Sequence, residues 1–176
     1  TDYIGSLQEF EQAINIHQAI RNHLGPYRFS LHSGSDKFSL YPILRRIAGQ
    51  GIHVKTSGTS WIEAVRVIAR ADFPFFVDLL SVALRDFETN AVSYEISADA
   101  AGIKPDSLAP ADIPRLFNDP SIRQIIHISY GSILRGDGAP ENSARRKRFM
   151  EILTASRDAY EDCLAAHLGR HLDLLT

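Results

Sequence analysis

The sequence predicts an α/β fold in which parallel strands alternate with helices. Residues 28–32 and 52–55 alternate apolar with polar side chains, which is the period of a strand with one buried face. Each stretch is followed by a polar, turn-rich segment and then by apolar residues at helical spacing. Two successive strand–loop–helix units favour parallel strands joined by right-handed crossovers.

The composition is that of an ordinary globular protein. The chain has 176 residues, 44% of them hydrophobic, and residues 1–176 are expected to form a single α/β domain. A formal net charge of −2 gives no reason to expect nucleic acid or an anionic membrane as a partner. The longest apolar runs, such as residues 73–80, are too short to span a bilayer. The single cysteine, Cys163, rules out an internal disulfide and fits a cytoplasmic location.

Local signals place the first two helices. Ser6 and Glu9 have the spacing of a capping box, in which each side chain accepts a hydrogen bond from an amide of the first turn. Apolar residues then recur at helical spacing over residues 7–24, and Gly25-Pro26 ends the run. A second helix is expected from about residue 39 to residue 48, between the two strands.

The second half of the sequence predicts the same alternation. Residues 72–87 form a very apolar helical stretch, which is expected to lie between layers or to cover an interface. Two more strands are expected at residues 92–97 and 125–129, separated by a loop or short helix rich in Asp, Gly and Pro. A long final helix is expected to begin near Ser143, with apolar residues as far as Leu168 on one side.

A run of four basic residues, 145–148, lies at the start of that last helix. The helix dipole disfavours cations at this end by a few tenths to about 1 kcal/mol. The run therefore has two interpretations: a solvated face, or a contact with an acidic partner surface or an anionic group.

His32 ends the polar face of the first strand, where barrel enzymes keep their sites. A neutral imidazole there is a metal ligand or an acid–base group, or else a hydrogen-bonded core histidine. Ser33 and Ser35 flank a glycine in a tight turn whose amides can hold a carboxylate. Asp36 either takes part in that site or caps the next helix, and Lys37 either neutralises an anion or is solvated.

The end of the second strand predicts an anion site. Lys55 ends the strand on its polar face, and Thr56 begins a hydroxyl-rich segment that leads to a helix N-terminus. The alternative is a structural ion pair between Lys55 and Glu95 of the third strand, and Glu95 is also a candidate acid–base group. His127, on the polar face of the expected fourth strand, is the second candidate metal ligand.

Several familiar motifs are absent from the sequence. It contains no Cys-x-x-Cys, no Gly-x-Gly-x-x-Gly, no P-loop and no nucleophile elbow. A nucleotide cofactor and a serine-hydrolase mechanism therefore have no support.

Three stretches carry a resemblance to a known family. Leu-His-Ser-Gly-Ser-Asp-Lys-Phe at residues 31–38, Gly-Ile-His-Val-Lys-Thr-Ser-Gly-Thr-Ser at 51–60 and Asp-Tyr-Ile-Gly at 2–5 resemble the tagaturonate/fructuronate epimerases. These are metal-dependent sugar-acid epimerases of hexuronate breakdown. The similarity runs over most of the chain, is strongest from residue 1 to about residue 69, and corresponds to the C-terminal portion of a family member.

The resemblance implies a fold and a reaction. The fold is the C-terminal half of a (β/α)8 TIM-like barrel, with a complete smaller doubly wound domain as the alternative. The reaction is epimerisation at C3 of a keto-hexuronate with a divalent metal cation of unknown identity, for which the resemblance favours His32 as a ligand. From the strand pattern, His127 is the second candidate ligand and Glu95 a possible acid–base group.

The substrate and the partners follow from the same resemblance. A sugar-acid carboxylate would be held by Ser33, Ser35, Asp36, Lys37, Lys55 and Thr56. Pairing with the missing barrel half, or homo-oligomerisation, would cover the open sheet. The alternatives are a metal-dependent aldolase or isomerase on another sugar acid, and a non-catalytic structural or interaction module.

Overall fold

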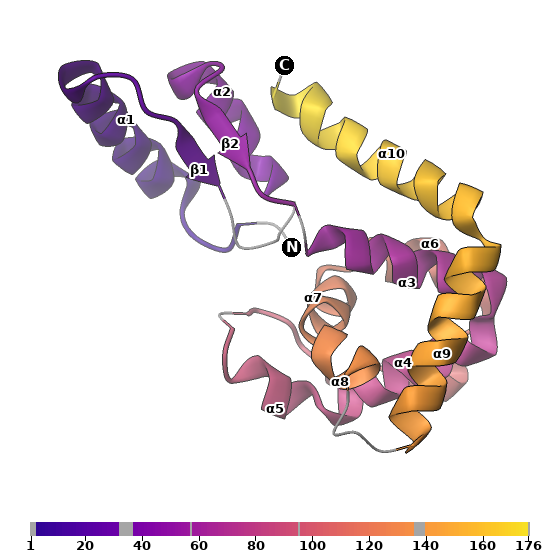
Figure 1. The fold of residues 1–176 in the computed structure, drawn as a ribbon. Helices are drawn as coiled ribbons and strands as arrows, with labels where there is room; N and C mark the ends of the chain where they lie inside the picture. Colours follow the sequence, from indigo (N-terminus) through magenta and orange to yellow (C-terminus); the bar gives the residue numbers. More distant parts are fainter. Residues whose placement is uncertain (1–2, 32–36, 57, 95, 136–139, 176) are drawn as a thin grey trace. The chain divides into compact units, whose positions relative to one another are not determined.

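The computed structural model describes residues 3–31, 37–56, 58–94, 96–135 and 140–175. They are mostly helical, with a small parallel sheet (Figure 1). The chain divides into two compact units: Thr1–Thr59 with Ala165–Thr176 (unit 1), and Ser60–Leu164 (unit 2). The expectation of one α/β domain stays a prediction. No helix in the described part of the chain is both long enough and apolar enough to cross a membrane.

Helix α1 of unit 1, Leu7–Leu24, has the expected boundaries. Ser6 Oγ accepts a hydrogen bond from the amide of Glu9 at 3.3 Å, which satisfies one of the unpaired donors of the first turn. The helix ends at Gly25, whose φ of 107° lies in a region that side chains with a Cβ avoid. The capping residues thus confirm this helix of the sequence analysis.

The sheet of unit 1 pairs β1, Phe29–Leu31, with β2, Ile52–Val54, in parallel. Between them lie a 3-10 turn, Phe38–Leu40, and α2, Tyr41–Ala48. In both strands the middle residue is exposed and the outer two are partly buried, which confirms the expected alternation. The apolar face packs on a cluster centred on Ile14, Leu40 and Leu44, which come from α1, the 3-10 turn and α2.

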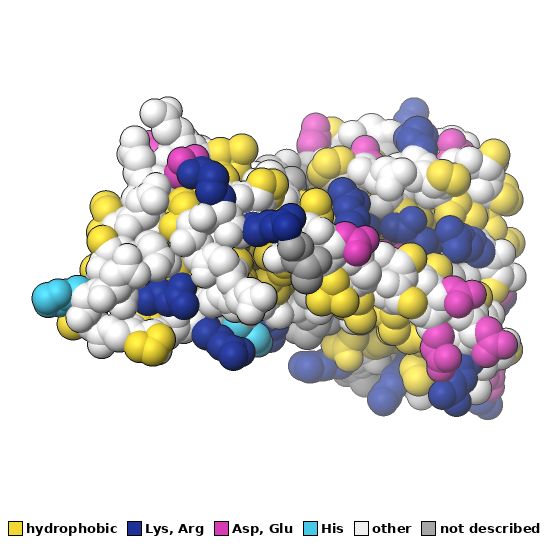
Figure 2. Space-filling model, turned by 90° about the horizontal axis from the view of Figure 1, so that it is seen from above, with side chains coloured by type: hydrophobic (Ala, Val, Ile, Leu, Met, Phe, Trp, Pro, Cys, Tyr) yellow, Lys and Arg dark blue, Asp and Glu magenta, His cyan; other side chains and the backbone are white. Residues whose placement is uncertain are grey.

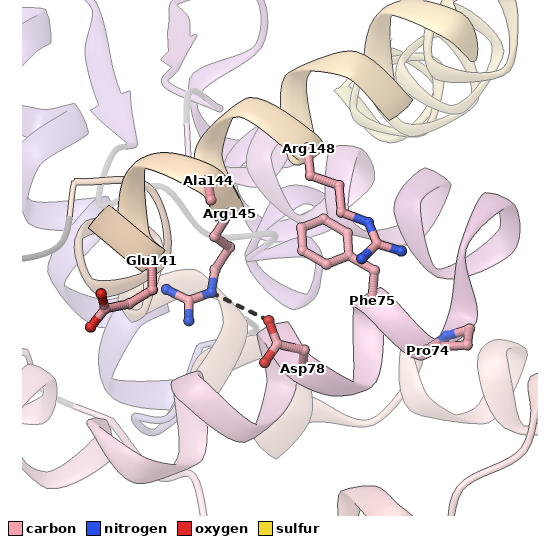
Figure 3. A pocket seen from close by; sticks show the side chains of 7 residues that line it. All are labelled: Pro74, Phe75, Asp78, Glu141, Ala144, Arg145 and Arg148. Carbon is pink, nitrogen blue, oxygen red and sulfur yellow. Dashed lines mark hydrogen bonds and ion pairs between the residues drawn. The ribbon is translucent and has the colours of Figure 1, made fainter. Parts of the chain in front are cut away.

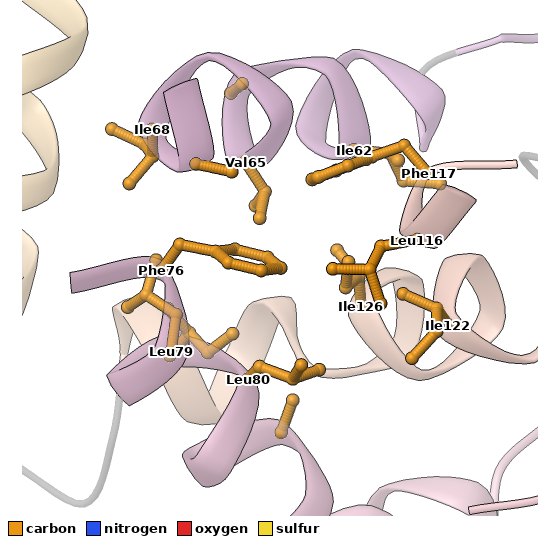
Figure 4. Packing of buried hydrophobic residues seen from close by; sticks show 14 of the residues in the cluster. Ile62, Val65, Ile68, Phe76, Leu79, Leu80, Leu116, Phe117, Ile122 and Ile126 are labelled. Carbon is orange, nitrogen blue, oxygen red and sulfur yellow. The ribbon is translucent and has the colours of Figure 1, made fainter. Parts of the chain in front are cut away.

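Unit 2 is organised around two apolar helices, α3, Thr59–Ala71, and α4, Phe73–Arg85. Asp72 caps α4 by accepting from the amide of Phe75 at 3.1 Å. The central core residues are less than 2% exposed, and Figure 4 shows several of them meeting between helices. They include Ile62, Ile68, Phe76, Leu79, Leu80, Leu116, Phe117, Ile125 and Ile126. The apolar stretch 72–87 is thus a central core helix of this unit.

The expected third strand, residues 92–97, is wrong. Helix α5, Phe87–Ala91, is followed by a turn at residues 92–94, and residues 96–97 have no regular structure. Val92 is 85% exposed, so the alternation of this stretch buries no face. The amide of Ser97 donates to Gln124 Oε1 at 2.9 Å instead of to a strand. A strand needs a neighbouring strand for its backbone groups, and none pairs with the described residues of this stretch.

Short elements connect this turn to the next helix. They are the 3-10 turns Pro105–Ser107 and Pro110–Asp112 and helix α6, Ile113–Leu116. They confirm the expected region of loops and short helices. Proline stands in the first turn of each, where no intrahelical amide bond is lost.

The expected fourth strand, residues 125–129, is also wrong. These residues belong to α7, Pro120–Ile128, and its cap, and α8, Tyr130–Leu134, follows. Asp119 accepts from the amide of Ile122 at 3.0 Å, and Pro120 occupies the first helical position. Ile122, Ile125 and Ile126 are buried at helical spacing. A short apolar run is compatible with a strand or a helix, and the cap decides for the helix.

The chain ends in two helices where one was expected. Helix α9 is Pro140–Ala155 and α10 is Arg157–Leu175, so the helical region begins before Ser143 and is interrupted at Ser156. Thr154 Oγ1 donates to the carbonyl of Met150 at 2.7 Å. A hydroxyl that donates to a carbonyl one turn back competes with the backbone amides for that carbonyl and favours a bend in the helix. This bond lies just before Ser156, where the two helices are separated.

The expected alternation of parallel strands and helices is confirmed only in part, and the half-barrel stays a prediction. Parallel strands alternate with helices over residues 29–54, but the described residues contribute two strands rather than four. Figure 2 shows one face of the molecule, on which basic side chains lie among hydrophobic, acidic and uncharged ones. The charge on that face is mixed.

Candidate functional site

The polar face of the β1–β2 sheet is the first part of the candidate site. Ser30 lies opposite His53 in the parallel register, and Ser30 Oγ is 3.1 Å from His53 Nδ1. Both residues are exposed. The sheet thus covers its apolar face with helices and leaves its polar face to solvent, as the alternation of the sequence indicates.

The carboxyl end of β2 carries the second part. The amide of Lys55 donates to the carbonyl of Leu31 at 2.9 Å, so the pairing extends to Lys55, whose side chain is exposed. The carbonyl of Thr56 accepts from both the amide and the Oγ1 of Thr59, at 3.0 and 2.7 Å. This turn opens α3, so a cation and a helix N-terminus follow one another along the chain, which is a combination that attracts anions.

Five of the predicted site residues lie outside the described residues: His32, Ser33, Ser35, Asp36 and Glu95. Their roles stay predictions. Lys37, the first described residue after Asp36, is half-buried, and its carbonyl accepts from the amide of Leu40 at 3.0 Å. Its backbone therefore begins the turn that leads into α2.

His127 has a different setting from the one expected. It lies on helix α7, not at a strand end, and is half-buried with its ring centroid 6.2 Å from that of Tyr94. Among the described residues, no three His, Cys, Asp or Glu side chains gather as the three-ligand set of a catalytic metal site would require. A metal-ligand role for His127 stays a prediction. The expected strand, which was the reason for proposing that role, is absent because residues 120–128 form a helix.

A buried cluster in unit 1 was not predicted. Tyr41, fully buried, places its Oη 2.5 Å from Nδ1 of His171 on α10, and His171 is 4% exposed. His171 Nε2 is in turn 3.2 Å from Nε2 of His167. Phe38 packs against His171 with its ring centroid at 4.7 Å, and the guanidinium of Arg170 lies over the Phe38 ring. The sequence shows that the two histidines are four residues apart and so share a helix face. It does not show that His171 contacts Tyr41, which is 130 residues away.

A buried ionic cluster in unit 2 was also missed. Glu63, 3% exposed, forms an ion pair with Arg66, whose Nε lies 2.8 Å from Oε2 and whose Nη2 donates to Oε1 at 3.4 Å. Glu63 also lies 3.7 Å from Arg123 Nη1. Burial, and then the charge of Glu63, raise the pKa of the Tyr160 hydroxyl above its usual value. Only the spacing of Glu63 and Arg66 is visible in the sequence. The long-range contact with Arg123 depends on the fold.

The basic run on α9 makes intramolecular contacts. Arg145 Nε lies 3.4 Å from Asp78 Oδ2, and Arg148 covers the ring of Phe75 (Figure 3). Arg148 also donates to Asp72 at 2.6 Å. A pocket of about 380 Å³ between α4 and α9 is lined by Phe75, Asp78, Arg145 and Arg148, among others. Arg146, Lys147 and Arg148 are exposed, as the interpretation of a solvated face expected, whereas Arg145 is half-buried beside Asp78.

The class of this protein follows from these observations. It is an α/β protein whose parallel strands carry polar residues at their carboxyl ends. More specifically, a model of the tagaturonate epimerase (UxaE) family matches residues 1–175, and the chain belongs to that family.

Individual relatives agree with this assignment. The chain is 38% identical over 175 residues to a protein of Thermotoga maritima named tagaturonate/fructuronate epimerase, covering 99% of this chain and 35% of that protein. The native crystal structure of fructuronate-tagaturonate epimerase UxaE from Cohnella laeviribosi matches 99% of this chain and 36% of its own, with 35% identity and a TM-score of 0.89. A glycerol complex of the same enzyme is 36% identical, with a TM-score of 0.90. The chain thus spans about a third of the length of these relatives.

Proposed function

We propose that this chain is part of an enzyme that interconverts tagaturonate and fructuronate. The observation that carries the proposal is the family match along residues 1–175, together with a relative of that name at 38% identity. Because the chain covers 35% of that relative, the activity belongs to a longer polypeptide of which this chain supplies one part.

The reaction sets chemical requirements on the site. The two sugar acids differ at C3, a carbon β to the ketone at C5, so the ketone does not directly acidify the C3 proton. One route is retro-aldol cleavage of the C3–C4 bond and re-addition to the other face; the other is removal and return of the C3 proton. Either route needs groups that hold the substrate, stabilise an oxyanion and move protons. Glu95 is our candidate for the proton-moving group on this chain.

The described residues do not by themselves fit a complete metal site, since no three suitable side chains gather among them. We assign His32, which follows β1 directly in the sequence, as the ligand that this chain contributes to a divalent cation, with His127 as a weaker second candidate. Bound there, the cation would act as a Lewis acid toward a developing oxyanion. Most of its ligands would come from the rest of the enzyme.

Lys55 is the residue proposed to bind the substrate carboxylate. Its backbone is fixed by the hydrogen bond to Leu31, and its side chain is exposed four residues before the start of α3 at Thr59. Thr56 begins the same turn, and Ser33, Ser35, Asp36 and Lys37 come after β1 in the sequence. An ammonium and helix amides together favour a carboxylate over a neutral group.

The sheet suggests how this part joins the remainder. A two-stranded sheet is marginal by itself, and the polar face of β1 and β2 is solvent-exposed in the described chain. We propose that these strands belong to a larger sheet, closing as a barrel, whose other strands lie in the remainder of the family's polypeptide.

The test replaces Lys55 in the full-length enzyme. NMR of a tagaturonate solution should show fructuronate appearing with the parent enzyme. Loss of a charge-assisted bond worth about 1.5–3 kcal/mol should lower kcat/KM roughly 10- to 100-fold in Lys55→Met, mainly through KM. Lys104→Met, which removes an exposed lysine from unit 2, is the matched control and should leave both constants unchanged.

Two results would argue against the proposal. A folded parent enzyme that converts neither sugar acid but acts on another would favour the alternative aldolase or isomerase. Equal kcat/KM values in the Lys55→Met and Lys104→Met variants would remove Lys55 from the substrate site while leaving the reaction itself in place.

A further inference from the structure

Two histidines of α10 lie one helical turn apart. Residues four apart project from the same face of a helix, and His167 Nε2 lies 3.2 Å from His171 Nε2. His171 is 4% exposed and His167 is half-buried, so the pair reaches from the interior of unit 1 to its surface.

The separation of the two nitrogens fits a shared cation. Zinc lies about 2.0–2.1 Å from imidazole nitrogens, and tetrahedral geometry then places two such nitrogens roughly 3.3 Å apart. An N–H···N hydrogen bond between the rings is the competing explanation of the same distance. The two explanations differ in the protonation of the rings: a shared cation requires both Nε2 atoms to be unprotonated, whereas a hydrogen bond requires a proton on one of them.

Tyr41 supplies the arrangement that orients a metal-binding histidine. Its buried Oη lies 2.5 Å from Nδ1 of His171. A ligating imidazole usually donates its other ring N–H to an oxygen, which fixes both the tautomer and the ring orientation. If Nδ1–H of His171 donates to Tyr41, its Nε2 lone pair is directed toward His167. The Phe38 ring, 4.7 Å from that of His171, holds the imidazole from the side.

We propose that His167 and His171 form a two-histidine site for a borderline transition-metal cation such as Zn²⁺ or Ni²⁺, completed by water. Imidazole suits these metals, whereas Mg²⁺ prefers oxygen ligands. The guanidinium of Arg170, over the Phe38 ring at 4.0 Å, adds positive charge nearby and further disfavours cations held by charge alone. This site is a second one, beside the cation proposed at His32, and does not depend on the epimerase activity.

The test observes the histidine rings directly. The full chain is labelled with ¹⁵N-histidine in a His32→Ala background, and Zn²⁺ and Mg²⁺ are titrated separately while long-range ¹H–¹⁵N spectra report each imidazole. We expect both rings to hold the Nδ1–H tautomer with shifted Nε2 resonances once Zn²⁺ is bound, which requires His167 to lose any proton on Nε2, and Mg²⁺ to leave the spectra unchanged. The half-buried His167 is the position to replace: His167→Asn should weaken Zn²⁺ binding at least tenfold. The exposed His23 on α1 is the matched control, and His23→Asn should leave the affinity unchanged.

A second variant separates the metal site from a structural role of the rings. Tyr41→Phe retains the packing but removes the oxygen beside Nδ1, and loss of such a partner should weaken Zn²⁺ binding about 10- to 100-fold. The proposal is overturned if Zn²⁺ leaves both rings unchanged, if His167→Asn binds Zn²⁺ as tightly as its parent, or if Mg²⁺ produces the same response. If the parent chain responds to Zn²⁺ but the His32→Ala chain does not, the response belongs to His32, and the proposal is also overturned.

Discussion

Asp119 offers a direct test of the helix that replaces the expected fourth strand. Its side chain accepts from the amide of Ile122 at 3.0 Å and satisfies a donor at the start of α7. Ile122 is 3% exposed, so water has little access to replace that bond. Removing an N-cap side chain costs typically about 1 kcal/mol, with a range of roughly 0.5–2. For a unit of about 100 residues, 1 kcal/mol lowers the melting temperature by roughly 4 °C.

The assay is urea and thermal unfolding of three variants, followed by circular dichroism. Asp119→Ala should lose about 1 kcal/mol, whereas Asp119→Asn, whose amide oxygen still caps, should stay within a few tenths of the parent. Asp106→Ala removes an exposed aspartate of the same unit as a control and should fall within about 0.5 kcal/mol of the parent. If Asp119→Ala matches Asp106→Ala, residues 120–128 are not held as a capped helix and the reasoning is refuted.

Two further stability predictions concern unit 2. Asp72→Ala loses both the cap bond to Phe75 and the ion pair with Arg148, so urea unfolding should show a loss of about 1–2 kcal/mol. Asp72→Asn retains the cap and should lose only about 0–1 kcal/mol; equal losses would contradict this division. Burial and the charge of Glu63 raise the pKa of Tyr160, so its neutral form is favoured on folding and that stability is lost as pH rises from about 10 through the folded-state pKa. Tyr160→Phe should flatten this alkaline decline in melting temperature, and parallel curves for the two proteins would speak against it.

The two strands that the sequence predicted correctly are encoded by the side chains of the strands themselves. The alternation in Phe29–Leu31 and Ile52–Val54 reflects an apolar face that helices cover and a polar face that they leave exposed. Ser6 and Gly25 marked the ends of α1 because both act locally. Ser6 accepts a hydrogen bond from an amide of the first turn, and Gly25 adopts a positive φ that other residues avoid. Signals of this kind require only a few neighbouring residues.

The two wrong strands show where local pattern is insufficient. Val92 and Tyr94 alternate with polar residues, yet both are exposed, because alternation stabilises a strand only when one face is buried and a neighbour pairs with the backbone. At residues 125–129 the apolar run has no decisive period. Asp119-Pro120 upstream is an N-terminal helix signal that outweighs it.

The candidate site was only partly readable for the same reason. The polar face that carries Ser30, His53 and Lys55 could be predicted, because side chains alternate between the two faces of a strand. The contacts of Tyr41 with His171 and of Glu63 with Arg123 join residues far apart in the chain, and no local spacing encodes them. The metal-binding role of His32 comes from the family resemblance and the acid–base role of Glu95 from the strand pattern; both stay predictions.

The most direct test of the central claim is NMR of tagaturonate and fructuronate incubated with the full-length enzyme in deuterated water, with and without a chelator. The account predicts interconversion of the two sugar acids that the chelator abolishes and added divalent metal restores. Deuterium at C3 would favour proton transfer there, and its absence would favour retro-aldol cleavage. A folded, metal-loaded, full-length protein that converts neither sugar acid would contradict the account.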